Sequence, residues 1–129
     1  MEIKRFGDQN GKKIMLVHGN LMCWRQFEDV IPLLEKAYCV YAVSFDGFDG
    51  TGETTYTTAR DQADKLADYI EKELDGRLGL LFAESLGCGS AVFLKASPNI
   101  QIGQMILSGP EYLDFGVLNR LILKVMPQK

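Results

Sequence analysis

Short apolar runs alternate with helical patterns along almost the whole chain. Five runs rich in aliphatic, β-branched and aromatic residues predict strands at residues 3–6, 13–17, 38–44, 78–82 and 104–108. Strands that alternate with helices are typical of a parallel sheet with helices on both faces. We therefore expect an α/β fold, doubly wound, with a mainly parallel sheet of about five strands.

The clearest helical pattern lies between the third and fourth predicted strands. Its apolar residues follow the i, i+3, i+4 spacing of one helix face, and charged residues fill the other face. The apolar residues are Ala63, Leu66, Ala67, Ile70 and Leu74. Thr58, with Asp61 three residues later, predicts the N-terminal cap of this helix. Gly76 predicts its end, because glycine readily adopts the conformation that closes a helix.

Three other segments also have helical spacing. One surrounds Trp24 and Phe27, and we expect Pro32 to break it because proline lacks an N–H and clashes with the preceding turn. A second, rich in small residues, follows the fourth strand as far as Ala96. The third has an apolar face that predicts the start of a cap or an association helix within residues 111–129; its members are Val117, Leu118, Leu121, Ile122, Val125 and Met126.

Composition and charge narrow the class of protein. The 129 residues suffice for a single domain, predicted over 1–129, and 47% are hydrophobic. The net charge of −3 comes without a basic stripe, so we expect no nucleic-acid partner. Neither a secretory leader nor a run of about 18 apolar residues is visible, so we expect no membrane span. Cys23, Cys39 and Cys88 lack metal-ligand spacing and predict buried thiols of a cytoplasmic protein, with neither metal nor cofactor.

Ser85 is the strongest candidate for chemistry. It lies between the fourth predicted strand and the helix after it, with Ala83 and Gly87 two positions to either side. Small neighbours allow a sharp turn that exposes the serine hydroxyl above the sheet. The following helix directs free N–H groups at the same point, starting with that of Leu86. An alternative is that Ser85 is only a helix N-cap, which is a common role for serine.

A second turn supports the first interpretation. His18, Gly19 and Asn20 follow another predicted strand, which in a doubly wound sheet can lie beside the serine strand. Both turns would then open at the carboxyl ends of parallel strands, where such folds place their sites. The N–H groups of Asn20 and Leu86 could form an oxyanion hole there.

Four motifs in order make the chain resemble the α/β-hydrolases. Residues 14–20 (IMLVHGN), followed by Trp24, are similar to the His-Gly oxyanion strand and turn of that family. Residues 40–46 and the Gly50-Thr-Gly52-Glu-Thr54 loop resemble its next strand and Gly-x-Gly loop, although this loop is one residue longer and has Thr for Ser. Residues 80–87 (LLFAESLG) match the nucleophile elbow, with Ala for its first Gly, and residues 105–109 resemble the strand that follows it.

The resemblance implies the amino-terminal half of a serine esterase or lipase-like hydrolase. It makes Ser85 the nucleophile, the N–H groups of Leu86 and Asn20 the oxyanion donors, and an ester or thioester the substrate. His18, Gly19, Glu84 and Gly87 would serve as pocket or structural support. In that family the acidic residue and then the histidine of the triad follow the serine, yet the only histidine here, His18, precedes it.

His18 therefore has two possible roles. It could reach the serine from the adjacent strand, or it could brace the oxyanion turn, and the resemblance favours the second. The charged residues near the presumed site, Asp46, Asp49 and Glu84, are expected to be solvated loop residues without a catalytic role. Without a base, a serine hydroxyl is a poor nucleophile.

Three functions remain to be compared. The first is a serine hydrolase fragment, inactive or weakly active as this chain because the triad Asp and His are absent. The second is a non-catalytic binding or self-assembly module that retains the fold and associates through the open edge at residues 104–108 or through the carboxy-terminal helix. The third, nucleotide binding, is disfavoured because no GxGxxG or phosphate-binding loop is present.

Overall fold

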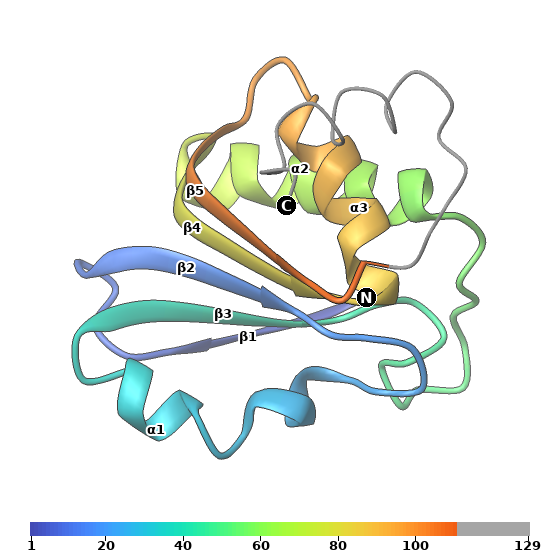
Figure 1. Cartoon of the computed structure of the whole chain (residues 1–129), viewed down its shortest axis with the longest axis horizontal. Coiled ribbons are helices and arrows are strands. Elements are labelled where there is room, and N and C mark those ends of the chain that lie inside the picture. Colours follow the sequence, from blue (N-terminus) through green and yellow to red (C-terminus); the bar gives the residue numbers. More distant parts are fainter. Residues whose placement is uncertain (111–129) are drawn as a thin grey trace, which may run out of the picture.

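The computed structural model describes residues 1–110, and its five strands form one sheet in the order β1-β3-β2-β4-β5 (Figure 1). The strands are β1 (Glu2–Phe6), β2 (Lys12–Val17), β3 (Tyr38–Ser44), β4 (Arg77–Glu84) and β5 (Gln101–Ser108). β1 runs antiparallel to β3, and every other neighbouring pair is parallel. The predicted mainly parallel sheet of five strands is confirmed.

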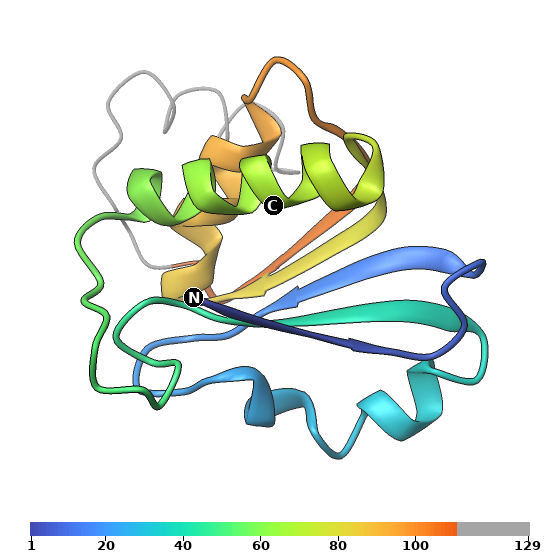
Figure 2. The ribbon, with the colours of Figure 1, turned by 180° about the vertical axis from the view of Figure 1, so that it is seen from behind.

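Helices lie on both sides of this sheet. The two longer ones, α2 (Ala59–Leu74) and α3 (Leu86–Lys95), pack side by side on one face. The short helices η1 (Trp24–Phe27), which is a 3₁₀ helix, and α1 (Ile31–Leu34) lie on the other, as Figure 2 shows from behind. The doubly wound arrangement expected from the sequence is therefore present.

The predicted signals at both ends of α2 are confirmed. Thr58 Oγ1 accepts a hydrogen bond from the N–H of Asp61 at 3.0 Å, which satisfies one of the free donors of the first turn. At the other end Asp75 and Gly76 adopt positive φ angles of 56° and 74°. The N–H of Gly76 then reaches back to the carbonyl of Ile70 at 2.9 Å and closes the helix.

The expectation for Pro32 was wrong. Instead of ending a helix around Trp24, Pro32 lies in the first turn of α1, and a separate 3₁₀ helix covers Trp24–Phe27. The first N–H groups of a helix have no partner within it, so proline fits there without losing a hydrogen bond. The segment thus forms two short helices.

Hydrophobic clusters fill both sides of the central strands. Consecutive side chains of β2 point to opposite faces, so Ile14 packs with Phe27 of η1 while Met15 packs in the cluster beneath α2 and α3. Ile14 and Met15 are 4% and 0% exposed. Burial on both faces fixes β2 and β3 in the middle of the sheet, where their carboxyl ends carry the loops described below.

The outer strand β5 is less protected. It pairs with β4 alone among the described strands, and Ile106 on it is 49% exposed. The predicted helix at Val117–Met126 lies outside the described residues. Of the three free cysteines, Cys39 and Cys88 are buried as expected, whereas Cys23 is half-buried. Within residues 1–110, no helix combines the length and the hydropathy needed to cross a membrane.

Candidate active site

The loops after β2 and β4 meet at the carboxyl edge of the sheet. β2 and β4 are parallel neighbours, with Val17 opposite Ala83. A Cβ atom built on Gly19 would lie 3.5 Å from Cβ of Ser85 and 3.6 Å from the carbonyl oxygen of Glu84. The structure therefore brings together the two turns that the sequence singled out.

Ser85 is a single residue between the last residue of β4 and the first of α3. Its φ of 46° and ψ of −111° lie in a region that residues with a side chain rarely adopt, at a cost of about 1–3 kcal/mol. Two backbone bonds hold it there. Its N–H donates to the carbonyl of Ser108 at 2.9 Å, and its carbonyl accepts from the N–H of Cys88 at 3.0 Å.

The geometry of Ser85 differs from that of an ordinary helix cap. A capping serine usually has extended backbone angles, and its hydroxyl accepts a hydrogen bond from the first turn. Ser85 has neither the extended angles nor the capping hydrogen bond, whereas Thr58 at the start of α2 has both. Capping alone therefore does not explain the conformation of Ser85.

Gly87 lets α3 approach β2 closely. A Cβ atom at this position would lie 2.7 Å from the carbonyl oxygen of His18 and 2.8 Å from Cγ1 of Val17. Since these distances are shorter than any tolerable contact, only glycine fits without displacing the helix. The absence of a side chain here sets the position of the first turn of α3, including the N–H of Leu86.

His18 is completely buried and bonded to the backbone through both ring nitrogens. Nδ1 donates to the carbonyl of Gly19 at 2.7 Å, and Nε2 accepts from the N–H of Phe45 at 3.0 Å. Burial lowers the pKa of His18, and the hydrogen bond to Gly19 only partly opposes this effect. The neutral ring thus ties the loop after β2 to the loop after β3.

Asn20 and its neighbours form the exposed part of the loop after β2. The Asn20 side chain accepts from the N–H of Leu21 at 3.0 Å, and Leu21 has a positive φ of 60°. Leu21 is 85% exposed. Beside it lies an open cavity of about 520 Å³, which Met22 and Phe48 also line.

Gln26 is a residue of this site that the sequence did not reveal. Its Oε1 accepts a hydrogen bond from the N–H of Gly19 at 3.0 Å, and its Nε2 donates to the carboxylate of Glu84. Gln26 therefore connects the loop after β2 with the residue that precedes Ser85. No periodic or motif signal marks it, because the bond to Glu84 spans 58 positions along the chain.

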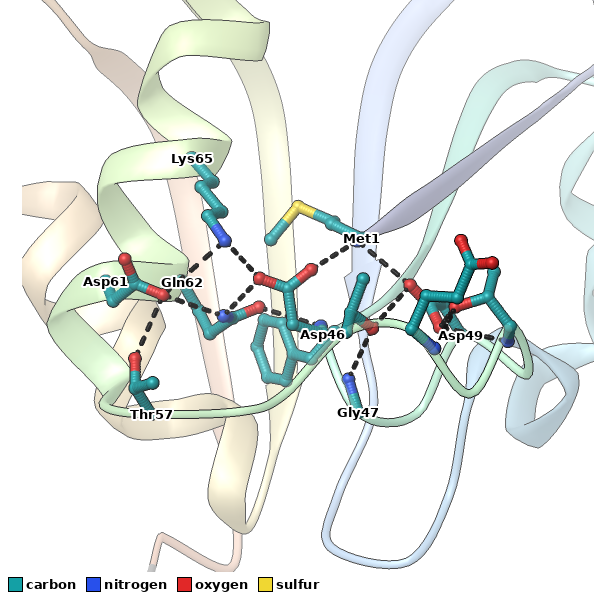
Figure 3. Close-up of polar contacts among 12 residues, drawn as sticks. Met1, Asp46, Gly47, Asp49, Thr57, Asp61, Gln62 and Lys65 are labelled. Atoms are coloured by element: carbon teal, nitrogen blue, oxygen red, sulfur yellow. Dashed lines mark hydrogen bonds and ion pairs between the residues drawn. The ribbon is translucent and has the colours of Figure 1, made fainter.

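The expectation of solvated loop residues was wrong for Glu84, which ends β4 half-buried and bonded to Gln26, and for Asp46 and Asp49. Both aspartate carboxylates are 4% exposed and lie in a polar network at the carboxyl end of β3 (Figure 3). Asp46 accepts from the amino group of Met1, from Lys65 and from Gln62 Nε2, the last at 3.0 Å. Charged groups can be buried when they have such partners. The residues next to Asp46 in the sequence do not reveal these partners, because the partners are distant along the chain.

Asp49 fixes the loop of residues 46–55. It accepts from the hydroxyl of Thr54 at 2.8 Å, from that of Thr51 at 2.9 Å and from the amino group of Met1 at 3.1 Å. The Thr54 hydroxyl also accepts from the N–H of Gly47 at 2.8 Å. Threonine at position 54 thus closes the loop through its hydroxyl.

These contacts lower the pKa of both carboxyl groups. Burial alone would raise the pKa of Asp46, but Lys65, the Met1 amino group and Gln62 more than offset it, so the pKa falls to about 2. Hydrogen bonds, above all that from Thr54, likewise lower the pKa of Asp49. Both groups are therefore ionised partners in a structural network.

Comparisons with known proteins agree with this architecture. The model of the alpha/beta hydrolase family matches residues 14–127. The chain belongs to the alpha/beta hydrolase family. No curated protein matches it.

Solved structures show how much of the family's fold is present. An alpha/beta hydrolase family protein from Desulfitobacterium hafniense is 23% identical with a TM-score of 0.82, over 94% of this chain and 49% of that one. An esterase from Thermogutta terrifontis is 22% identical with a TM-score of 0.73, over 85% and 40%. MenH from S. aureus is 19% identical with a TM-score of 0.73, over 93% and 46%. The chain spans between 40% and 49% of the length of these three proteins.

Proposed function

We propose that this chain is the nucleophile-bearing half of a serine hydrolase that acts on esters or thioesters. The observation that carries the proposal is the conformation of Ser85, at a φ of 46° between β4 and α3, with the loop of Gly19 packed against it. Strain that the surrounding structure maintains at one residue is typical of a functional position. A purely structural serine would gain nothing from it.

In the proposed reaction, Ser85 Oγ attacks the acyl carbon and forms a tetrahedral intermediate. A general base takes the hydroxyl proton and returns it to the leaving alcohol or thiol as the acyl bond breaks. Water then releases the acid from the acyl-serine by the same route. The N–H groups of Asn20 and Leu86 would stabilise the oxyanion, because Asn20 lies in the loop packed against Ser85 and Leu86 is the first residue of α3, directly after Ser85.

His18 does not suit the role of that base. Both of its ring nitrogens are engaged by backbone groups, and its pKa is lowered by burial. We assign His18 to bracing the oxyanion loop. The base and its acidic partner would come from a segment or chain outside these 129 residues, so this chain by itself should be inactive or nearly so.

A fluorophosphonate probe tests the proposal. In the complete protein the probe should label Ser85, as peptide mass spectrometry would show, and Ser85→Ala should lose at least about a thousandfold in labelling rate. Ser90→Ala is the matched control, because Ser90 is a buried serine of α3 that bonds to the carbonyl of Ala59 at 3.1 Å. Absence of labelling at Ser85 in the complete protein would refute the proposal.

A second candidate, a non-catalytic module that associates with itself, is favoured by the outer strand. β5 has no second neighbour among the described strands, and Ile106 on it is 49% exposed. Open strand edges promote pairing between chains. Light scattering at micromolar concentration should then give a dimer or larger species that Ile106→Lys reduces to monomers, and a monomeric parent protein would count against this candidate.

A further inference from the structure

The contacts of Gln26 carry an inference that rests on the proposed function and extends it. Gln26 lies on η1, half-buried, and touches both loops of the candidate site. We propose that Gln26 and Glu84 are positioning residues that hold the oxyanion loop in register with the nucleophile. Neither residue needs to contact the substrate in this role.

The helix η1 is anchored on both sides of Gln26. On one side, the N–H of Trp24 donates to Ser44 Oγ at 3.0 Å, and the Trp24 ring packs against Phe6 at a centroid distance of 5.7 Å. On the other side, Phe27 is 6% exposed and meets Phe82 of β4 edge to face at 5.9 Å. Gln26 therefore projects from a fixed platform.

The amide of Gln26 has one oxygen that accepts and one nitrogen that donates, and each has a different partner. Oε1 accepts from the N–H of Gly19, and Nε2 donates to Glu84. An ionised carboxylate can only accept hydrogen bonds, so Glu84 fixes the orientation of the amide. With Nε2 held toward Glu84, Oε1 is directed at Gly19. Glu84 thus determines whether the Gln26 amide can accept the hydrogen bond from the N–H of Gly19.

Gly19 links the hydrogen bonds of Gln26 to the proposed oxyanion hole and nucleophile. Asn20, which carries the proposed oxyanion donor, follows it directly, and Gly19 lies against Cβ of Ser85. Glu84 likewise directly precedes Ser85. Gln26, bonded to Gly19 and to Glu84, therefore acts as a clamp. This clamp joins the residue before the oxyanion donor to the residue before the nucleophile. Because a displacement of about 1 Å in such a site can reduce the rate about a hundredfold, the clamp should matter for the rate.

Exchanging the two side chains provides a direct test. In Gln26→Glu two carboxylates would face each other, and the bond to Glu84 would be lost. In Glu84→Gln the amide at position 84 can still accept from Gln26. In the double variant Q26E/E84Q, the carboxylate at position 26 would accept both from the N–H of Gly19 and from the amide at position 84. The exchange thus restores both hydrogen bonds with the roles of the two positions reversed.

The first measurement is the rate of fluorophosphonate labelling of Ser85 in the complete protein, with kcat and KM for a p-nitrophenyl ester. We expect Gln26→Glu to lower the labelling rate and kcat about 10- to 100-fold while KM changes less than about threefold. The double variant should return to within about threefold of the parent, whereas Glu84→Gln should lose less than Gln26→Glu does, because its amide can accept from Gln26 but no longer fixes the orientation of that side chain. Gln104→Glu, an exposed exchange of the same type on β5, is the control and should have no effect.

Failure of the double variant to recover, or an unchanged rate in Gln26→Glu, would overturn the proposal. A readout without chemistry separates it from the proposed hydrolase. Hydrogen exchange at the Gly19 amide should be at least about tenfold faster in Gln26→Leu than in the parent protein. If Ser85 is not labelled but this exchange accelerates, the hydrolase proposal fails while the clamp stands. Unchanged exchange refutes the clamp by itself.

Discussion

The segments at the carboxyl ends of β3 and β4 differ in what is energetically costly about their central residue. After β3, Asp46 is a buried charge whose partners include Lys65, Gln62 and the Met1 amino group. After β4, Ser85 is a small neutral residue whose backbone is held in a costly conformation. The first segment supports the fold, whereas the second stores strain at the position proposed for chemistry. One edge of a sheet thus holds both a stabilising site and a strained one.

The largest expected effect comes from filling the space at Gly87. Gly87→Val would place a branched side chain where a Cβ atom alone already lies 2.7 Å from the backbone of His18. We expect a loss of about 3 kcal/mol in the free energy of unfolding, because the contact involves backbone that cannot rotate away. Urea unfolding followed by circular dichroism measures this. Ala96→Val, at the exposed end of α3, is the control and should change stability by less than about 0.5 kcal/mol.

Breaking the network after β3 should cost somewhat less. Asp46→Asn keeps the size of the side chain but removes the buried charge that pairs with Lys65 and the Met1 amino group, and leaves Met1 with Asp49 alone as its buried anion. We expect a loss of about 2 kcal/mol at neutral pH, which corresponds to the shift of the Asp46 pKa from 3.8 to about 2. Glu28→Gln, which removes the exposed partner of Arg25, should change stability by less than about 0.5 kcal/mol.

Acid provides the check on the Asp46 variant. Because the folded-state pKa lies below the unfolded one, the stabilisation is complete above pH 3.8 and is lost as the pH falls toward 2. The parent protein should therefore lose stability more steeply over this range than Asp46→Asn does. Parallel pH profiles for the two proteins would show that Asp46 does not act through its charge.

The smallest effect sharpens the comparison at Ser85. Ser85→Gly removes the Cβ atom that makes a φ of 46° unfavourable, so we expect the fold to become about 1 kcal/mol more stable while labelling is lost. Ser97→Gly is the matched control, because Ser97 has no positive φ and bonds through its hydroxyl to Phe93. This control should destabilise the protein by about 0.5–1 kcal/mol. A loss of stability in Ser85→Gly would mean that no strain is stored there.

Much of this architecture follows from local patterns in the sequence. The apolar runs at 13–17 and 38–44 coincide with β2 and β3 to within one residue, and the capping signal at Thr58 marks the start of α2. The fourth strand was predicted at 78–82 but extends over Arg77–Glu84, because its polar end residues still pair with β5. The proximity of the turns at Gly19 and Ser85 was also predictable, since parallel neighbouring strands end at the same edge.

The parts that were missed depend on contacts between distant residues. Asp46 resembles a solvated loop residue until Lys65 and Met1 are brought to it by the fold. Gln26 resembles any polar residue of a short helix, and its two bonds join residues 7 and 58 positions away. Contacts of these two kinds, a buried charge with its partners and a side chain that bridges two loops, produce no periodic pattern in the amino-acid sequence. The roles assigned to Ser85, Asn20 and Leu86 remain predictions.

The position of Trp24 has a practical consequence. It is the only tryptophan of the chain, and its ring lies 4.8 Å from both the Lys4 ammonium and the Arg25 guanidinium. It also belongs to the same 3₁₀ turn as Gln26. Its fluorescence emission is therefore an intrinsic optical reporter, so movement of that turn could be followed in real time without attaching a dye.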